Sequence, residues 1–148
     1  MGAVEIEKHE IEPGVDFSWQ SHDEVNFSCS DLSGVRFVGA YLARADFSGS
    51  NLSKARFVGA YLRGAVLTGA DLAGANLTGA NLKDADLDWA NLSGTNLSGA
   101  NLSETDLTRA KPFPPDLTRA DLTGATADTE TIWPEGFDPV VAGVTFED

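Results

Sequence analysis

The stretch Ala70-Asp71-Leu72-Ala73-Gly74-Ala75-Asn76-Leu77-Thr78-Gly79 decides the fold, because it holds two copies of one five-residue pattern. Each copy has a small residue, an Asn or Asp, a Leu and then a pair of turn-forming residues. The central position of this pattern is Leu or Phe at every fifth residue from Phe27 to Leu107, and after a break Leu117 and Leu122 continue the series. An internal repeat with a short fixed period indicates a solenoid.

A period of five residues is not compatible with an α-helix. At about 100° per residue, the central position would advance by about 140° from one repeat to the next and would cover all sides of a helix. The sequence small–polar–Leu instead alternates inward, outward and inward, as a short strand does. The pair that follows is often Ser-Gly or Thr-Gly, which turns the chain. A short strand and a turn, repeated without a long connection, wind into coils that bury their Leu residues against one another.

The number of repeats in one coil follows from a longer duplication. The segment Arg36-Phe37-Val38-Gly39-Ala40-Tyr41-Leu42 recurs four repeats later as Arg56-Phe57-Val58-Gly59-Ala60-Tyr61-Leu62. Four repeats per coil would stack these two segments directly, like residue on like residue. In that register the Phe residues at positions 27, 37, 47 and 57 occupy two opposite sides of the first coils.

The repeat A-(D/N)-L-x-x resembles that of the pentapeptide-repeat family, and the resemblance covers roughly residues 25–126. It implies an all-β fold, a right-handed quadrilateral parallel β-helix of about five to six coils with short end caps. Coils about 4.8 Å apart would form a rod on the order of 27 Å long. The resemblance also implies that the Ala and Leu or Phe positions point inward. It implies little about activity.

Three regions are expected along the chain. Residues 1–14 are an acidic N-terminal tail, residues 15–126 form the β-helix with a cap coil at 15–24, and residues 127–148 form a C-terminal capping tail. The segment 111–115 contains three prolines, which cannot donate ladder hydrogen bonds, so we expect a bulge or loop there. The ends of a solenoid need to be covered. The apolar residues expected to cap this one are Phe17, Trp19, Phe113, Trp133 and Phe137. Phe113 either covers the core or is free for a partner.

Composition excludes several classes of function. No apolar run approaches the roughly 20 residues that span a membrane. The N-terminus lacks the regions of a secretory signal, and the single cysteine fits a reducing compartment, so a cytoplasmic location is expected. The net charge of −13 argues against direct nucleic-acid binding. That charge lies at the two ends of the sequence. Residues 1–24 have seven acids and one Lys (−6), and residues 111–148 have eight acids and two bases (−6). Residues 25–110 have eight acids and seven bases, which gives only −1.

The sequence offers no catalytic constellation. Its only histidines, His9 and His22, lie in the N-terminal tail and cap, and Cys29 falls at an outward turn position. His22 and Cys29 could be neighbours, but no group that would orient them is evident, and we expect solvated polar residues. The Gly-x-Gly patterns do not lead into a helix, so no phosphate-binding loop is expected. We therefore expect no enzyme activity and no cofactor.

Acidic residues gather in the second half of the repeats. With four repeats per coil they are expected on one corner of two adjacent coils: Asp84, Asp86, Asp88, Glu104 and Asp106. Their spacing resembles no calcium loop, so a solvated patch that a basic partner could bind is expected in place of a metal site. Trp89 is expected one coil below Arg109, where the two side chains either stack as a cation–π pair or anchor a partner.

The duplicated segment predicts an unusual outward surface. The positions where the repeat normally has Asn, Asp, Ser or Thr carry instead Arg36, Val38, Tyr41, Arg56, Val58 and Tyr61. Tyr and Arg are enriched at the centres of protein interfaces, and a contiguous apolar patch is a candidate contact site. The competing interpretation is a ladder of like side chains stacked on the solenoid surface. The sequence does not choose between the two.

Two functions follow from these observations. The first is a non-catalytic protein-binding scaffold, monomeric or dimeric, that uses the Tyr/Val/Arg face or the C-terminal end. The alternative comes from the resemblance: some pentapeptide-repeat proteins mimic duplex DNA, bind DNA gyrase and protect it from gyrase-targeting antibiotics. DNA carries about one negative charge per 1.7 Å, or roughly 16 over such a rod. Here residues 25–66 have two acids and five bases (+3), and residues 67–110 have six acids and two bases (−4).

Overall fold

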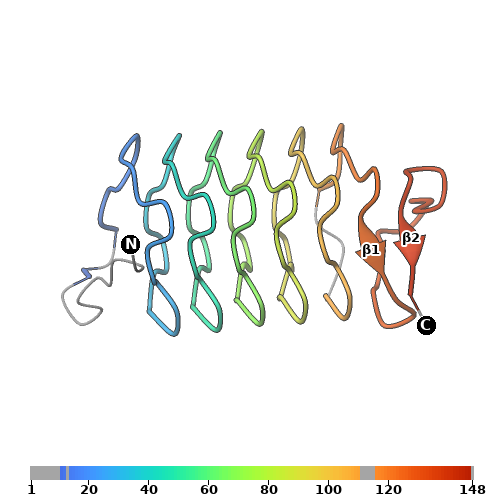
Figure 1. The fold of residues 1–148 in the computed structure, drawn as a ribbon, viewed down its shortest axis with the longest axis horizontal. Coiled ribbons are helices and arrows are strands. Elements are labelled where there is room, and N and C mark those ends of the chain that lie inside the picture. The colour runs from blue at the N-terminus through green and yellow to red at the C-terminus, as the bar shows by residue number, and fades with distance from the viewer. Residues whose placement is uncertain (1–10, 13, 111–115, 148) are drawn as a thin grey trace.

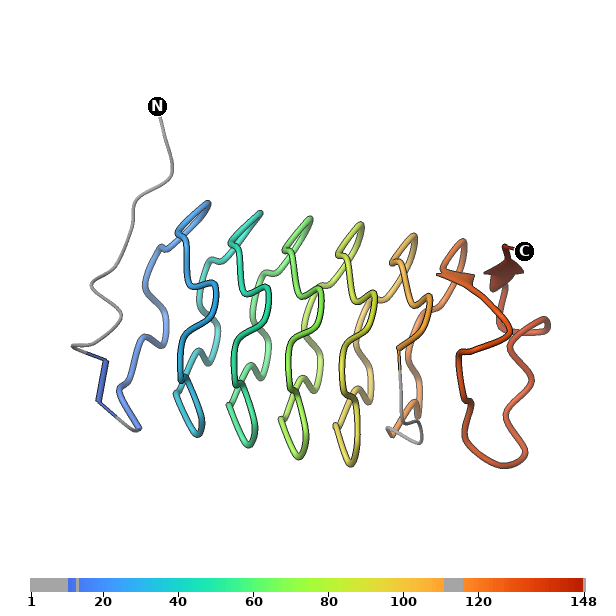
Figure 2. The ribbon, with the colours of Figure 1, turned by 90° about the horizontal axis from the view of Figure 1, so that it is seen from below.

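The computed structural model describes residues 11–12, 14–110 and 116–147. The chain winds into a right-handed, four-sided parallel β-helix whose coils stack along one axis (Figures 1 and 2). Residues paired between successive coils are four repeats apart, as in Arg36 with Arg56 and Tyr41 with Tyr61. The expected β-helix and the expected four repeats per coil are therefore both confirmed.

Each side of the rod is defined by the outward residue that pairs between coils. The first side has Asp16, Arg36, Arg56, Asn76, Asn96 and Asp116. The second side has Ser21, Tyr41, Tyr61, Asn81, Asn101 and Asp121. The third side has Asn26, Asp46, Val66, Asp86, Asp106 and Thr126. The fourth side has Asp31, Asn51, Asp71 and Asn91. The first corner joins the first side to the second, and the other corners are numbered likewise.

The core is filled by the inward Ala and Leu or Phe positions, which are almost completely buried. Phe27 stacks on Phe47 with ring centroids 5.0 Å apart, and Phe37 stacks on Phe57 at the same distance. These two columns face each other across the first coils with edge-to-face contacts, such as 5.6 Å between Phe37 and Phe47. Offset-stacked and edge-to-face geometries are both favourable for aromatic rings. Leu replaces Phe from position 67 onward.

The corners are β-turns, closed for example by the Val35 N–H donating to the Leu32 carbonyl at 3.1 Å. The second turn residue has a positive φ, as at Gly34 (68°), and a turn of this kind favours glycine at that position. Non-glycine residues adopt the same conformation at ten described corners, including Trp19, Trp89 and Arg109. A positive φ costs about 1–2 kcal/mol for an ordinary side chain, so these side chains are placed outward against a local preference.

The Asn or Asp of the repeat stabilises the turn that follows it. At every described outward position that carries Asn or Asp, the side-chain oxygen accepts a hydrogen bond from the backbone N–H two residues later. Bonds from Ser18 hold the pKa of Asp16 below its usual range, and bonds from Ser33 do the same for Asp31. Asn and Asp favour turns because their short side chains reach the backbone in this way.

At the N-terminal end, Phe17 and His22 occupy inward positions. The ring of Phe17 stacks on Phe37 at 5.4 Å, and that of His22 meets Phe17 edge-on at 5.1 Å. The expectation of a solvated His22 is therefore wrong: its imidazole is half-buried over the aromatic core, away from Cys29, which is exposed at the third corner. The expectation that Trp19 caps the end of the core is also wrong. Trp19 is 72% exposed, because residue 19 is an outward turn position.

Protonation of His22 is expected to destabilise the N-terminal end. Burial lowers the pKa of His22 below its usual value of 6.5. Above pH 6.5 both folded and unfolded states hold a neutral ring, so the stability is unaffected. As the pH falls below 6.5, the unfolded chain binds a proton that the folded chain resists, so stability declines until the folded pKa is passed.

The wild-type melting temperature should therefore fall between pH 7 and pH 5.5 more than that of His22→Leu. His22→Leu places the usual residue of the repeat at this position and serves as the reference for all other titrating groups. Equal pH profiles for the two proteins would contradict a role for His22.

At the C-terminal end the chain leaves the repeat and returns. The strands β1 (Thr126–Ala127) and β2 (Thr145–Phe146) pair in parallel, Thr126 with Thr145, and add one level to the third side (Figure 1). Between them Trp133 and Phe137 stack at 5.4 Å and pack against the core. The expected loop at 111–115, with Phe113, lies outside the described residues. Asn96 still pairs with Asp116, at the usual spacing of one coil, so the register is the same on both sides of this segment.

Candidate interaction surfaces

The duplicated segment brings its outward residues together on two adjacent coils. Tyr41 and Tyr61 lie on the second side with their rings stacked 4.8 Å apart at 3°, and they are 46% and 47% exposed. The stacked ladder expected from the sequence is thus present, and its rings remain accessible to solvent. Arg36 and Arg56 are exposed on the adjoining first side.

The first corner completes this surface. Val38 and Val58 lie there, partly exposed, between the arginine side and the tyrosine side. Trp19 comes from the coil before, and its indole lies across Gly39 so closely that no Cβ would fit at residue 39. We call this set of seven the tyrosine surface: Trp19, Arg36, Val38, Tyr41, Arg56, Val58 and Tyr61. Sequence reasoning did not place Trp19 on this surface, although its position one coil length before Gly39 was a signal for the contact.

The acidic residues do not gather on one corner as expected. Asp86 and Asp106 lie on the third side, whereas Asp84 and Glu104 lie on the second corner and Asp88 on the third corner. Three of these acids also meet cations of the rod: Arg63 lies 3.5 Å from Asp84, Lys83 3.8 Å from Glu104 and Arg109 2.7 Å from Asp88. These partners are distant in sequence and meet because neighbouring coils stack. This arrangement corrects the prediction of a single solvated acidic corner.

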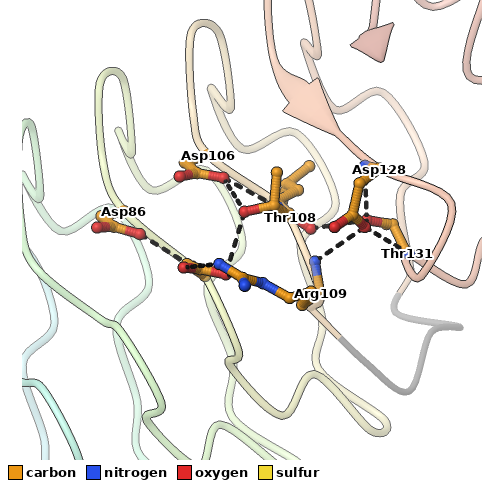
Figure 3. A network of polar contacts seen from close by, with 8 residues as sticks. Asp86, Asp106, Thr108, Arg109, Asp128 and Thr131 are labelled. Carbon is orange, nitrogen blue, oxygen red and sulfur yellow. Dashed lines mark hydrogen bonds and ion pairs between the residues drawn. The ribbon is translucent and has the colours of Figure 1, made fainter. Parts of the chain in front are cut away.

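Arg109 is the centre of a polar network that joins the last coils to the C-terminal tail (Figure 3). Its guanidinium binds Asp88 through Nε and Nη2 at 3.1 and 2.7 Å, and the hydrogen bond to Asp88 raises the pKa of Arg109. Its backbone N–H donates to Asp128 at 3.2 Å, and the Thr131 hydroxyl donates to the Leu107 carbonyl at 2.9 Å. The network therefore holds the tail against the rod.

Arg109 also packs on an aromatic ring. Its guanidinium carbon lies 4.8 Å from the centre of the Trp89 ring, which is the cation–π pair expected from the sequence. Trp89 is still 55% exposed. The indole of Trp89 therefore already has a partner within the chain. This contact explains the outward Trp without a binding partner, so we do not include Trp89 in an interaction surface.

The described surface offers little for metal or acid–base chemistry. Among the described residues no group of three or more His, Cys, Asp or Glu could hold a metal ion. A hollow of about 390 Å³ between the last coil and the tail is lined by Leu117, Pro134 and Phe137, with Asp116 and Glu135 as its carboxylates. Neither histidine nor cysteine is among the residues that line this hollow. In the described part of the chain no helix is long and apolar enough to cross a membrane.

Comparison with known proteins agrees with this geometry. The pentapeptide repeats family matches the sequence in eight copies, over residues 14–49, 30–69, 45–84, 55–94 and 85–111. This chain belongs to that family. No curated protein matches it at a significant level.

Solved structures of pentapeptide-repeat proteins are similar to this one. HetL from the cyanobacterium Nostoc sp. strain PCC 7120, a protein involved in heterocyst differentiation regulation, is 34% identical with a TM-score of 0.70; the match covers 78% of this chain and 54% of HetL. This chain thus spans about half the length of HetL. The protein alr5209 from Nostoc PCC 7120 is 37% identical (TM-score 0.67, 69% of this chain and 84% of that one). Rfr23 from Cyanothece 51142, 23% identical (TM-score 0.59, 90% and 88%), shares the fold.

Proposed function

We propose that this protein is a non-catalytic scaffold that binds a protein partner through the tyrosine surface. The exposure of three large aromatic side chains, Trp19, Tyr41 and Tyr61, on adjoining coils is the observation that carries this proposal. The corresponding positions of later coils hold Gly79, Asn81 and Asn101, so the aromatic residues are not required by the repeat. Trp, Tyr and Arg dominate the binding energy of protein interfaces because they combine large contact area with polar groups.

The surface also comes at a cost to the fold. Arg36, Tyr41, Arg56 and Tyr61 stand where Asn or Asp would accept a hydrogen bond from the following turn. In two of the four turns a side chain of the coil before accepts the bond instead: the Val38 N–H donates to Ser18 Oγ at 3.0 Å and the Ala43 N–H to Asp23 Oδ1 at 2.7 Å. Each forfeited bond is worth about 0.5–1.5 kcal/mol. Four such replacements in two adjacent coils are better explained by a use of the outward side chains than by the stability of the rod.

The double variant Val58→Glu with Tyr61→Ser is expected to lose partner binding and to keep its fold. Both side chains point outward, so the β-sheet circular dichroism and the melting temperature should change little. Partner capture by the immobilised intact chain, read by mass spectrometry, measures the effect. The matched control is Ser98→Glu with Asn101→Ser, at the same corner and side two coils further along. Unaltered capture by the first variant would exclude the tyrosine surface.

A homodimer formed through the C-terminal end is a second candidate for this scaffold. Its apolar residues are exposed where the rod ends: Ile132, Val140, Val141 and Phe146. Phe146 lies on β2, which is the last strand of the third side. Exposed strand edges and apolar patches favour association with another chain. Sedimentation equilibrium of the intact chain distinguishes a dimer from a monomer.

The DNA-mimic alternative has weaker support. A mimic needs an unneutralised anionic stripe, whereas Asp84, Asp88 and Glu104 are each paired with a cation of the rod. Gyrase supercoiling assays with and without a fluoroquinolone separate the two functions. Inhibition or protection at low micromolar protein would favour mimicry, and no effect at a large excess would favour the scaffold.

A further inference from the structure

Two cations of the tyrosine surface lack the partners that other cations of the rod have. Arg44, Arg63, Lys83 and Arg109 each form an ion pair with an acid of a neighbouring coil. Arg36 and Arg56 form no ion pair with any described residue, although both are exposed and lie on the same side. The guanidinium groups are therefore available to a ligand.

The two arginines are also placed against each other. A direct parallel pairing stacks Arg36 on Arg56 at the coil spacing of about 4.8 Å, and like charges directly opposite in a sheet are destabilising. Asp16, which precedes Arg36 on the first side, accepts hydrogen bonds from Ser18 and forms no ion pair with Arg36, although the charge of Arg36 adds to the lowering of the Asp16 pKa. Exposed Lys54, at the corner before Arg56, adds a third positive charge without a described ion pair. A carboxylate ligand would relieve this repulsion.

The apolar half of the surface lies beside these charges, with the valines on the first corner and the tyrosines on the second side. A ligand that meets both halves must present carboxylates on one side and apolar groups on the other. An extended peptide does this when acidic and apolar residues alternate, because successive side chains point in opposite directions. The distance from Trp19 to Val58 covers two coil steps, about 10 Å, or roughly three to four extended residues at about 3.3 Å each.

We propose that the tyrosine surface binds an extended segment of a partner protein in which acidic and apolar residues alternate, with its carboxylates on Arg36 and Arg56 and its apolar side chains on the valines and tyrosines. This inference rests on the proposed function and specifies the chemistry of the partner. Arginine suits the role because its planar guanidinium binds a carboxylate through two hydrogen bonds. Single-stranded nucleic acid is the competing ligand, but the partly exposed valines between the arginines and the tyrosine rings suit apolar side chains better than bases.

The test uses the intact protein carrying a fluorophore on Cys29, which is exposed at the corner diagonally opposite the tyrosine surface. The probes are immobilised ten-residue peptides in which Glu, Lys or Ser alternates with Leu or Tyr, and a ten-residue oligothymidylate. The Glu peptides are expected to bind, and to bind more weakly as salt is raised. The double variant Arg36→Glu with Arg56→Glu should lose at least tenfold in affinity for them and gain affinity for the Lys peptides.

Arg119→Glu is the control, because Arg119 is an exposed cation without a described ion pair at the first corner, which borders the side of Arg36 and Arg56, three coils from residue 59. It should leave binding unchanged. Binding without preference for Glu, equal loss in the control, or tighter binding of the oligothymidylate would each overturn the inference. If partner capture is lost in Val58→Glu with Tyr61→Ser but kept in Arg36→Glu with Arg56→Glu, the proposed function stands and only the acidic segment fails. If both variants retain capture, the proposed function fails as well.

Discussion

Replacing Phe37 with Ala is expected to lower the free energy of unfolding by about 3–5 kcal/mol. Phe37 is fully buried and lies at the centre of the aromatic core. It stacks on Phe17 at 5.4 Å and on Phe57 at 5.0 Å, and it meets Phe27 and Phe47 edge-on at 5.6 Å each. The cavity would remain open because the coils above and below are fixed by backbone hydrogen bonds. Urea unfolding followed by circular dichroism measures the loss.

Phe37→Leu is the control for this change. Leu77 and Leu97 occupy the same inward position on the first side in later coils, so the backbone accepts Leu there. Its cost should lie near that of a tolerated hydrophobic exchange, below about 1.5 kcal/mol. If the two variants lost the same small amount of unfolding free energy, the first coils would have to relax and fill the cavity in Phe37→Ala. That result would contradict the expectation that the backbone hydrogen bonds between coils keep the cavity open.

Asn76→Pro is expected to cost several kcal/mol, because proline removes a hydrogen bond from the middle of the ladder and leaves the partner carbonyl unsatisfied. The Asn76 N–H donates to the Ala55 carbonyl of the coil before at 2.9 Å. The Asn76 side chain accepts bonds from the Thr78 N–H and hydroxyl at 3.1 and 2.6 Å, and these would be lost too. Thermal unfolding should show a large decrease in melting temperature.

Thr78→Pro, only two residues away, should cost much less, because it loses only the two bonds to the Asn76 side chain, worth about 0.5–1.5 kcal/mol each, and no ladder bond. Residue 78 is the first central residue of a turn, where proline is favoured, and its N–H bonds only the Asn76 side chain. Its carbonyl, which accepts from Gly59, is kept. If Thr78→Pro were as unstable as Asn76→Pro, the turn at this corner would not accept proline at its first central position, contrary to the prediction.

The repeat predicted the fold because it constrains the backbone and the core together. A five-residue period with buried Leu fixes which residues point inward, and the duplication of Arg36–Leu42 fixes the coil length. These two facts also placed Tyr41 beside Tyr61 and Trp89 beside Arg109. Where a side chain follows the repeat, its position can be read from its number alone.

The errors arose where residue type was given more weight than position in the repeat. We expected His22 to be a solvated polar residue, but its position is inward. We expected Trp19 to cap the core, but its position is outward. The acids were placed on one corner of two adjacent coils, whereas positions 84, 86 and 88 within one coil belong to a corner, a side and the next corner. Their ion pairs, for example Arg63 with Asp84, could have been found by comparing each acid with the cations about one coil length away.

The constant register of four repeats per coil has a consequence for how such a molecule can change in length. Removing residues 67–86 would join Val66 to Leu87 in phase with the repeat, shorten the rod by about 4.8 Å, and leave both ends facing as before. Removing a single repeat would instead rotate everything beyond the deletion by a quarter turn, so that the C-terminal tail would follow a different side. Length can therefore be gained or lost in whole coils without altering how the two ends are oriented. The identical segments at 36–42 and 56–62 have the form that duplication of one such unit would leave.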